Sequence, residues 1–440
     1  MSVLAGARTR LLLPPVWRTV IPFLWKVKYF SSGKESAKSN HVTPMLRHLT
    51  YKIKATGPIT VAEYMKEVLT NPVKGYYVHQ DMIGERGDFI TSPEISQIFG
   101  ELLGIWYISE WMASGKSSTF QLVELGPGRG TLTGDILRVF SQLGSVLKNC
   151  DISVHLVEVS QKLSEIQALT LTDETVTLEH NAESPVYLKG ITKSGIPISW
   201  YRSLQDVPQG YSFYLAHEFF DALPVHKFQK TQQGWREVLI DVDPQDSDKL
   251  RFVLAPSATP AEAFIQPEET RDHVEVCPDA GVFIQILSKC IEENGGAALI
   301  ADYGHDGTKM DTFRGFCGHK LHDVLIAPGT ADLTADVDFS FLRRMTQGKV
   351  ASLGPIQQCS FLKNMGIDVR LKVLLDSSSD DAATRKQLIH GYDMLMNPKK
   401  MGERFNFFVL LPHHRLAGGN TCQSKSVPSP VAGFGELVWK

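Results

Sequence analysis

Short apolar runs alternate with helical patterns through the middle of the chain. Four strongly apolar runs, each flanked by turn residues, lie at 120–125, 154–159, 211–216 and 297–301. Runs of this length fit strands that are buried on both faces of a mostly parallel sheet. Between the first two runs, the apolar positions 132, 136, 139, 140 and 143 fall on one helical stripe. This order predicts a βαβ unit, whose crossover is right-handed.

Helices are predicted before the first of these strands. Thr60 and Glu63 have the spacing of a capping box, and the helix that they begin ends at Pro72. A second, long helix opens with Pro93, a residue suited to the first helical position. It is apolar on nearly every side, so we expect it to be buried. Together these helices define an N-terminal helical extension over residues 41–115.

Two stretches interrupt the alternation inside the sheet domain, which we assign to residues 116–414. Residues 235–256 predict two strands joined by an acidic turn, a hairpin within an insertion at about 227–290. Residues 304–330 are rich in glycine, histidine and aspartate and predict a loop. Residues 415–440 are rich in serine, glycine and proline, so we expect a flexible tail.

The overall charge and the cysteines exclude several classes of protein. A net charge of -3 gives no electrostatic case for binding nucleic acid, which requires a strongly basic surface. The six cysteines are scattered and form no C-x-x-C pair, so neither a disulfide framework nor a zinc site is indicated. The acidic turn that begins at Asp241 lacks the glycine and glutamate of a calcium loop. We therefore expect no metal.

The first forty residues differ in composition from the rest. Arginine and lysine are interspersed with large apolar residues, and no acid occurs before Glu35. This pattern is typical of a mitochondrial transit peptide. The alternative is a disordered basic leader that carries no address. Prolines and charges break the apolar runs well short of the roughly 20 residues that span a bilayer, so we predict no membrane span.

A glycine-rich turn follows the first predicted strand and carries the main chemical signal. The turn contains Gly126, Pro127, Gly128 and Gly130. Its G-x-G-x-G spacing differs from the G-x-G-x-x-G of a dinucleotide site. Glu124 precedes the turn, and such an acid suits a zwitterionic ligand without phosphate, such as S-adenosylmethionine. Glu158, at the end of the second strand, is then expected to accept hydrogen bonds from the ribose hydroxyls. The alternative is a tight strand–helix turn without a ligand.

Five longer motifs resemble the MidA family. They are residues 87–100 (GDFITSPEISQIFG), 122–130 (LVELGPGRG), 216–224 (AHEFFDALP), 301–304 (ADYG) and 332–339 (DLTADVDF). The resemblance covers about residues 42–411. It implies a class I S-adenosylmethionine-dependent methyltransferase, an α/β protein with a Rossmann-like seven-stranded sheet and helices on both faces. It also implies protein arginine methylation in the mitochondrial matrix, giving symmetric dimethylarginine on a complex I subunit during early assembly of complex I.

The resemblance directs attention to polar residues after the third strand. A guanidinium is held best by paired carboxylates, and Glu218 and Asp221 lie in the loop where this fold receives its substrate. We expect these two acids, together with His217, to face the target arginine. Alternatively, the acids cap the next helix or pair with a nearby basic residue, and His217 is a histidine at a strand end whose hydrogen bonds are satisfied within the protein. The resemblance further implies that Thr91, Ser92 and Glu94 close over the methionine end of the cofactor.

Other functions remain open at this point. A cofactor-binding assembly chaperone that methylates nothing has the same glycine turn. A small-molecule methyltransferase is also compatible, because one fold carries many chemistries. A homodimer is possible, and no pattern in the sequence decides it.

Overall fold

The structure is a computed structural model, and it describes residues 42–79, 91–173, 179–180, 185–378, 381–416 and 431–435. The predicted transit peptide at 1–40 lies outside the described residues, as do the first four positions of the 87–100 motif. Among the described residues, no helix is long and apolar enough to cross a membrane.

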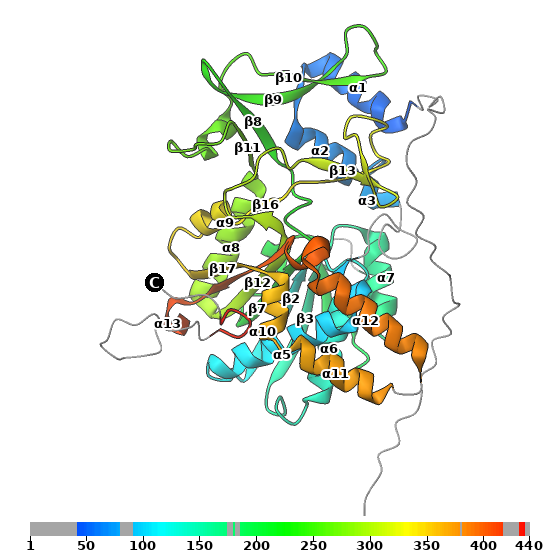
Figure 1. Ribbon diagram of the computed structural model, residues 1–440, viewed down its shortest axis with the longest axis vertical. Helices are drawn as coiled ribbons and strands as arrows, with labels where there is room; N and C mark the ends of the chain where they lie inside the picture. Colours follow the sequence, from blue (N-terminus) through cyan, green and yellow to red (C-terminus); the bar gives the residue numbers. More distant parts are fainter. Residues whose placement is uncertain are drawn as a thin grey trace, which may run out of the picture. The chain divides into compact units, whose positions relative to one another are not determined.

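The molecule is built on a ten-stranded mixed sheet with the order β17-β18-β12-β7-β2-β3-β6-β5-β4, in which β16 adds to β12 (Figure 1). The parallel centre consists of β6 (Pro197–Tyr201), β3 (Asp151–Val157), β2 (Thr119–Leu125), β7 (Ser212–His217) and β12 (Gly296–His305). On one side, β18 (Phe405–Leu411) runs antiparallel to both β12 and β17 (Ala351–Gln357). On the other, β5 (Val186–Ile191) and β4 (Glu179–His180) add an antiparallel edge.

The four predicted strands correspond to β2, β3, β7 and β12, and they are buried because helices cover both faces of the sheet. One face packs against α5 (Gln97–Ala113), α6 (Thr131–Gln142), α7 (Gln161–Leu171) and α10 (Gln358–Asn364). The other packs against α8 (Pro278–Asn294) and α9 (Phe339–Met345). Two further helices, α11 (Ile367–Ser377) and α12 (Ala382–Met396), follow α10, and the η3 segment (Pro398–Gly402) leads into β18.

A second, smaller sheet is formed by the insertion together with the start of the chain. The predicted hairpin is present as β9 (Gly234–Val242) and β10 (Leu250–Leu254), which pair antiparallel. The sheet also contains β8 (His226–Thr231), β11 (His273–Val276) and β1 (Ile59–Thr60). Helices α1 (Pro44–Thr56) and α2 (Val61–Thr70) pack on it in one apolar cluster (Figure 1). The short α3 (Tyr76–His79) follows α2, and η2 (Pro260–Phe264) precedes β11.

The loop predicted at 304–330 is wrong in part. This stretch contains β13 (Arg314–Cys317) and β14 (Lys320–His322), which pair antiparallel. β15 (Asp332–Thr334) pairs with β13 from the other side, and β16 (Val337–Asp338) then joins β12. The strands are too short to show a period of two, and they form because a partner from outside the stretch, β15, completes the pairing.

Two predicted helical boundaries also differ from the structure. The long helix at Pro93 is divided into α4 (Ser92–Ile95) and α5, because Ser96 adopts an extended backbone and its side chain accepts a hydrogen bond from the Ile98 amide. α5 is buried on nearly every side, as predicted, and packs with the sheet domain rather than in a separate extension.

The predicted insertion ends too late, at 290. Helix α8 has an apolar face that packs against the main sheet, so the inserted part ends near β11, at about Val276. Likewise, the described part of the predicted flexible tail is packed. Val431 and Phe434 are buried, and the Trp106 Nε1 donates a hydrogen bond to the Ala432 carbonyl. Apolar residues within a polar segment give this stretch a place in the core. The last described helix, α13 (His413–Leu416), directly follows β18.

Candidate active site

A cavity of about 1050 Å³ opens at the carboxyl ends of the central strands β2, β3 and β7. Ligands of open α/β sheets bind at this edge, where the strand order reverses on either side of the first strand. The predicted site residues that line the cavity are Glu124, Gly126, Pro127, Gly128, Glu158, His217, Glu218 and Asp221. The structure therefore brings together residues that are almost a hundred positions apart in the sequence.

The glycine turn between β2 and α6 has a backbone conformation that residues other than glycine rarely adopt. Gly126 and Gly128 have positive φ angles of 61° and 54°, in the left-handed region that favours glycine. A Cβ on Gly126 would lie 3.0 Å from the ring of Phe219, in the turn that follows β7. The two turns are therefore in contact. Gly130 lies where α6 begins and is not part of the cavity lining.

Glu124 faces the cavity from the end of β2 and is almost fully buried. Its carboxylate accepts a hydrogen bond from the Thr133 hydroxyl in the first turn of α6. Burial raises the pKa of Glu124 to about 7, against the smaller lowering effect of the Thr133 hydrogen bonds. This acid is therefore poised to change its charge when a cationic group binds beside it.

Glu158 follows β3 and is held by its neighbours. Its carboxylate accepts hydrogen bonds from the Ser160 amide at 2.8 Å and from the Gln167 Nε2 at 3.1 Å. The same Gln167 nitrogen donates to the Gly128 carbonyl at 2.7 Å, and the Trp200 Nε1 donates to the Gln167 Oε1 at 2.9 Å. Gln167 thus couples the glycine turn to Glu158. Burial raises the pKa of Glu158.

The turn after β7 carries the candidate catalytic acids. Glu218 has a positive φ of 50°, which is uncommon for a residue other than glycine and recurs at functional sites. Its amide donates to the Ala301 carbonyl on the neighbouring strand β12. The next three amides, of residues 219–221, all donate to one oxygen of Asp302. The turn is therefore fixed by β12.

Glu218 is half-buried, and its Oε1 is a buried atom. Among the described residues, its Oε1 and the Nε2 of His217 have no hydrogen-bond partner, although they lie 3.6 Å apart. Burial raises the pKa of Glu218 well above its usual range, and the negative charge of Asp221 adds to this effect. Burial lowers the pKa of His217 to about 3, so its ring is neutral. This pair of polar atoms is ready for a ligand with hydrogen-bond donors.

Ser92 lies behind Glu218 instead of facing the cavity. Its side chain is fully buried and absent from the lining, which includes its neighbours Thr91, Pro93 and Glu94. The Ser92 backbone amide hydrogen-bonds the Glu218 carboxylate. The predicted closure over the cofactor thus has its nearest structural counterpart in Glu94, whose carboxylate accepts a hydrogen bond from the Thr131 hydroxyl.

Asp221 is the second buried acid of the turn. Its Oδ2 accepts a hydrogen bond of 2.8 Å from the Thr334 hydroxyl, and burial raises its pKa. Two basic side chains, Lys309 and Arg314, also reach the cavity, but both form ion pairs of 2.6 Å with Asp336. These two cations therefore share one carboxylate.

Several residues of the site were not found from the sequence. Gln167, Thr133, Tyr77, Arg314 and Thr334 either line the cavity or hydrogen-bond its acids. Some of their partners are far away in the chain: the Tyr77 hydroxyl donates to Asp332 across 255 positions, and the Thr334 hydroxyl donates to Asp221 across 113. The sequence offers no local spacing that identifies such a pair. The acids of the 332–339 motif were the only feature of the sequence that pointed to this part of the site.

The residues of the cavity fit S-adenosylmethionine. The glycine turn admits a ligand close to the backbone, and Glu124 and Glu158 offer buried hydrogen-bond acceptors. The glycines of the turn do not have the spacing with which a dinucleotide site binds phosphate at the start of a helix. The volume of about 1050 Å³ lies at the upper end of the range of roughly 300–1000 Å³ that is usual for small-ligand pockets, so a molecule of this size fits.

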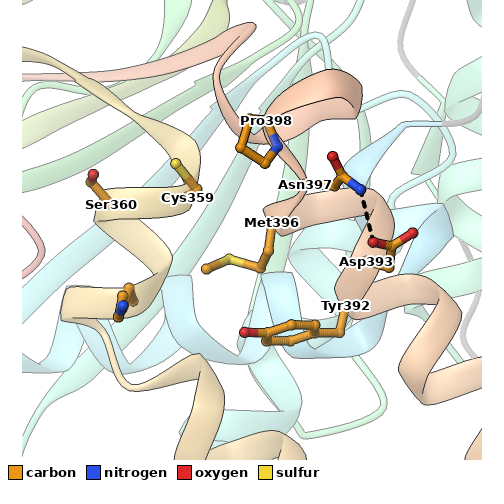
Figure 2. A pocket seen from close by; sticks show the side chains of 8 residues that line it. Cys359, Ser360, Tyr392, Asp393, Met396, Asn397 and Pro398 are labelled. Carbon is orange, nitrogen blue, oxygen red and sulfur yellow. Dashed lines mark hydrogen bonds between the residues drawn. The ribbon is translucent and has the colours of Figure 1, made fainter.

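A second hollow lies on the surface between α10 and the end of α12 (Figure 2). It measures about 550 Å³ and is lined by Cys359, Ser360, Lys363, Tyr392, Asp393, Met396, Asn397 and Pro398. Its polar groups are largely paired within the protein. Asn397 donates to Asp393, as drawn in Figure 2, and the Tyr392 hydroxyl donates to Asp368. Among the described residues, no group of three or more His, Cys, Asp or Glu side chains could hold a metal ion.

The sheet order, the glycine turn and the acid after the second strand define a class I S-adenosylmethionine-dependent methyltransferase. A family model described as "Putative S-adenosyl-L-methionine-dependent methyltransferase" matches residues 102–356, and the chain belongs to this family. The predicted family resemblance, enzyme class and cofactor are confirmed. The predicted fold class is confirmed as well, with three strands added to the seven expected.

Similar proteins are known over the whole length of the chain. It is 80% identical over 429 residues to human "Protein arginine methyltransferase NDUFAF7, mitochondrial", which covers 97% of each chain. The fruit fly homolog of that protein, from Drosophila melanogaster, is 47% identical over 406 residues, covering 91% of this chain and 92% of the relative. The relationship also confirms the predicted mitochondrial location.

A solved structure shares the fold. A bacterial protein from Burkholderia thailandensis, crystallised with S-adenosyl-homocysteine, superposes with a TM-score of 0.69. The superposition covers 86% of this chain and 95% of the bacterial one, at 24% sequence identity. At this identity the likeness establishes the architecture.

Proposed function

We propose that this chain is a protein arginine methyltransferase of the mitochondrial matrix. In this proposal it forms symmetric dimethylarginine on a subunit of complex I and so supports early assembly of the complex. The observation that supports arginine as the substrate is the buried Oε1 of Glu218, which has no hydrogen-bond partner among the described residues and lies on the turn that contacts the glycine turn. The names of the relatives, which are mitochondrial protein arginine methyltransferases, support it.

The cofactor half of the proposal rests on the two strand-end acids. Glu124 accepts hydrogen bonds from the amino group of the bound cofactor, and Glu158 accepts them from the ribose hydroxyls. When bound, S-adenosylmethionine supplies a methyl group that is already activated on a sulfonium. The protein therefore contributes mainly position, by holding the acceptor nitrogen in line with that methyl group.

The substrate half of the proposal rests on the turn after β7. Glu218 and Asp221 bind the target guanidinium, since a pair of carboxylates matches its fork of N–H groups. His217 stays neutral and accepts a hydrogen bond through its free Nε2. A proton must leave the nitrogen as it gains the methyl group. The charge of the bound guanidinium would favour the ionised form of Glu218, whose free Oε1 would then accept that proton while S-adenosylhomocysteine leaves.

The acids of the cavity outnumber its basic side chains. Among the described residues, seven acids line it, namely Glu94, Glu124, Glu158, Glu218, Asp221, Asp332 and Asp336, and four basic residues do, namely Arg129, Lys309, Arg314 and Arg404. Two of the basic residues, Lys309 and Arg314, share the carboxylate of Asp336. A positively charged arginine is attracted to an excess of acids, whereas an acidic side chain is repelled.

The test combines transfer with chemical identification of the product. The full chain is incubated with methyl-labelled S-adenosylmethionine and a protein extract from mitochondria that lack the enzyme. The labelled proteins are then hydrolysed and their amino acids separated. We expect label in symmetric dimethylarginine, on a protein that assembles into complex I. Label on lysine, or in small molecules alone, contradicts the proposal.

The same assay separates the enzyme from a chaperone that only binds the cofactor. A chaperone binds S-adenosylmethionine and the subunit but transfers no label. Label that requires the cavity acids, with binding unchanged in the acid variants, supports catalysis. Label in asymmetric dimethylarginine would keep the arginine site and exclude the symmetric product.

A further inference from the structure

Asp302 is a buried acid that lies at the active site without lining it. It follows Ala301 near the end of β12 and is fully buried. Among the described residues, the cavity lining includes its neighbour Tyr303 but not Asp302 itself. The side chain therefore acts on the site through other groups.

All of the hydrogen bonds described for Asp302 come from backbone amides. Its Oδ2 accepts from Phe219 at 3.2 Å, from Phe220 at 2.9 Å and from Asp221 at 3.3 Å. Its Oδ1 accepts from Tyr303 at 2.9 Å. Three successive amides that converge on one oxygen form a nest, a backbone arrangement that binds an anion. Here the acceptor is the side chain of Asp302; burial and the charges of Asp221 and Glu218 raise its pKa well above the usual range, and the amides of Phe220 and Asp221 lower it.

The same turn presents the proposed substrate acid. Glu218 precedes the three amides directly, and its backbone is in the left-handed region with a φ of 50°. A buried amide without an acceptor is costly, so these amides will take whichever acceptor is near. The acids on the same turn are Glu218 and Asp221, whose carboxylates are alternative acceptors. If either acid turned back to the amides, it would no longer face the cavity.

We propose that Asp302 is a positioning residue that occupies the amides of the turn and thereby keeps the Glu218 carboxylate free for the substrate guanidinium. The inference rests on the proposed function of Glu218. Burial of an acid at this position destabilises its charged form, and the amides are the compensation. A carboxylate serves because both of its oxygens are acceptors, one for the turn and one for Tyr303.

Asp302→Asn is the direct test. Asparagine has the same shape but a single acceptor oxygen, so either the turn or the Tyr303 amide faces an NH2 group. We expect the transfer rate at saturating S-adenosylmethionine to fall at least 30-fold, while the KM for the cofactor stays within threefold of the wild type. Amide hydrogen exchange in residues 217–224 should become faster. A general loss of structure would instead impair cofactor binding in parallel.

Asp338→Asn is the matched control. Asp338 caps α9 and also accepts hydrogen bonds from backbone amides, those of Ser340 and Phe341. Among the described residues it does not line the cavity. We expect Asp338→Asn to lower the melting temperature and to leave the transfer rate within threefold of the wild type. Should Asp302→Asn yield no folded protein, Asp302→Ser keeps one small acceptor and is expected to lose rate in the same direction.

The outcomes separate this inference from the function on which it rests. Full transfer by Glu218→Gln refutes the role of Glu218, and with it the purpose of the Asp302 bonds. If Glu218→Gln is inactive and Asp302→Asn is fully active, only the positioning role of Asp302 is refuted. A parallel loss of rate and cofactor affinity in Asp302→Asn refutes it as well, because the effect is then not confined to the turn.

Discussion

Two hollows, the cavity at the strand ends and the surface hollow between α10 and α12, differ in how their polar groups are satisfied. In the surface hollow, Asp393 accepts a hydrogen bond from Asn397 and pairs with Lys400, and the Tyr392 hydroxyl donates to Asp368. In the cavity, the Glu218 Oε1 and the His217 Nε2 are buried and have no hydrogen-bond partner among the described residues. A hollow alone therefore does not mark a site; the cavity differs in having such unpaired polar atoms in its lining.

The difference has an energetic meaning. A buried polar group without a partner costs about 1–3 kcal/mol, and more when it carries a charge. A fold that keeps such groups next to a strained turn gives up stability at that place. Among the described residues that line the surface hollow, no buried side-chain nitrogen or oxygen lacks a hydrogen-bond partner. Substitutions should therefore affect function in the cavity and, at most, stability in the surface hollow.

The largest expected effect is that of Glu218→Gln. The amide keeps the shape of the side chain but cannot carry the negative charge that holds a guanidinium or accept its proton. We expect transfer to arginine to fall by about three orders of magnitude, since general base catalysis and charge pairing contribute together. Binding of S-adenosylhomocysteine, measured by calorimetry, should stay within threefold. A variant that transfers at the normal rate would remove Glu218 from the mechanism.

The next effect concerns the glycine turn. Gly128 has a φ of 54°, which a β-branched residue rarely adopts, so Gly128→Val should displace the turn and weaken cofactor binding at least a hundredfold. Gly366→Val is the matched control, because Gly366 also has a positive φ but a Cβ there meets nothing within 4 Å. Titration with S-adenosylhomocysteine compares the two. Equal losses in both variants would assign the effect to general strain.

A smaller effect is the pH dependence of cofactor binding. The pKa of Glu124 is raised to about 7 by burial, and the amino group of the ligand favours the ionised form. Affinity for S-adenosylhomocysteine should therefore rise about tenfold between pH 6 and pH 8, as the ionised fraction rises from roughly a tenth to nine tenths. The ligand-free protein behaves in the opposite sense. The stability that protonated Glu124 confers is complete below pH 4.5 and is lost as the pH rises through 7.

Glu124→Gln provides the control for this titration. It should bind the ligand more weakly at pH 8 and show a flat profile between pH 6 and pH 8. If the affinity of this variant still rose with pH as in the wild type, a group other than Glu124 would be responsible for the pH dependence.

The smallest effect is expected in the surface hollow. Tyr392→Phe removes one hydrogen bond to Asp368 at the protein surface, which contributes at most about 1 kcal/mol. Transfer and cofactor binding should stay within twofold of the wild type, and the melting temperature should fall by a few degrees at most. A large loss of transfer would mean that the surface hollow takes part in substrate binding, and the contrast between the two hollows would no longer hold.

Local patterns predicted the elements that position the cofactor site. The apolar runs gave β2, β3, β7 and β12 to within a few residues, and the glycine spacing excluded a dinucleotide site. The acids Glu124 and Glu158 were placed at strand ends, where the structure has them. By contrast, β13 and β14 were predicted as a loop, because they are too short to show a strand pattern and the sheet that they form is completed by β15 from outside the stretch.

The sequence by itself determined what neighbours in the chain can decide: strands buried by continuous apolar runs, helices begun by caps, and a turn that only glycine tolerates. The tertiary structure decided what distant segments must supply. Gln167 joins the glycine turn to Glu158, and Asp302 on β12 saturates the turn that carries Glu218. The physical reason is that backbone conformation is a local property, whereas the pairing of a buried polar group depends on whichever segment the fold brings beside it.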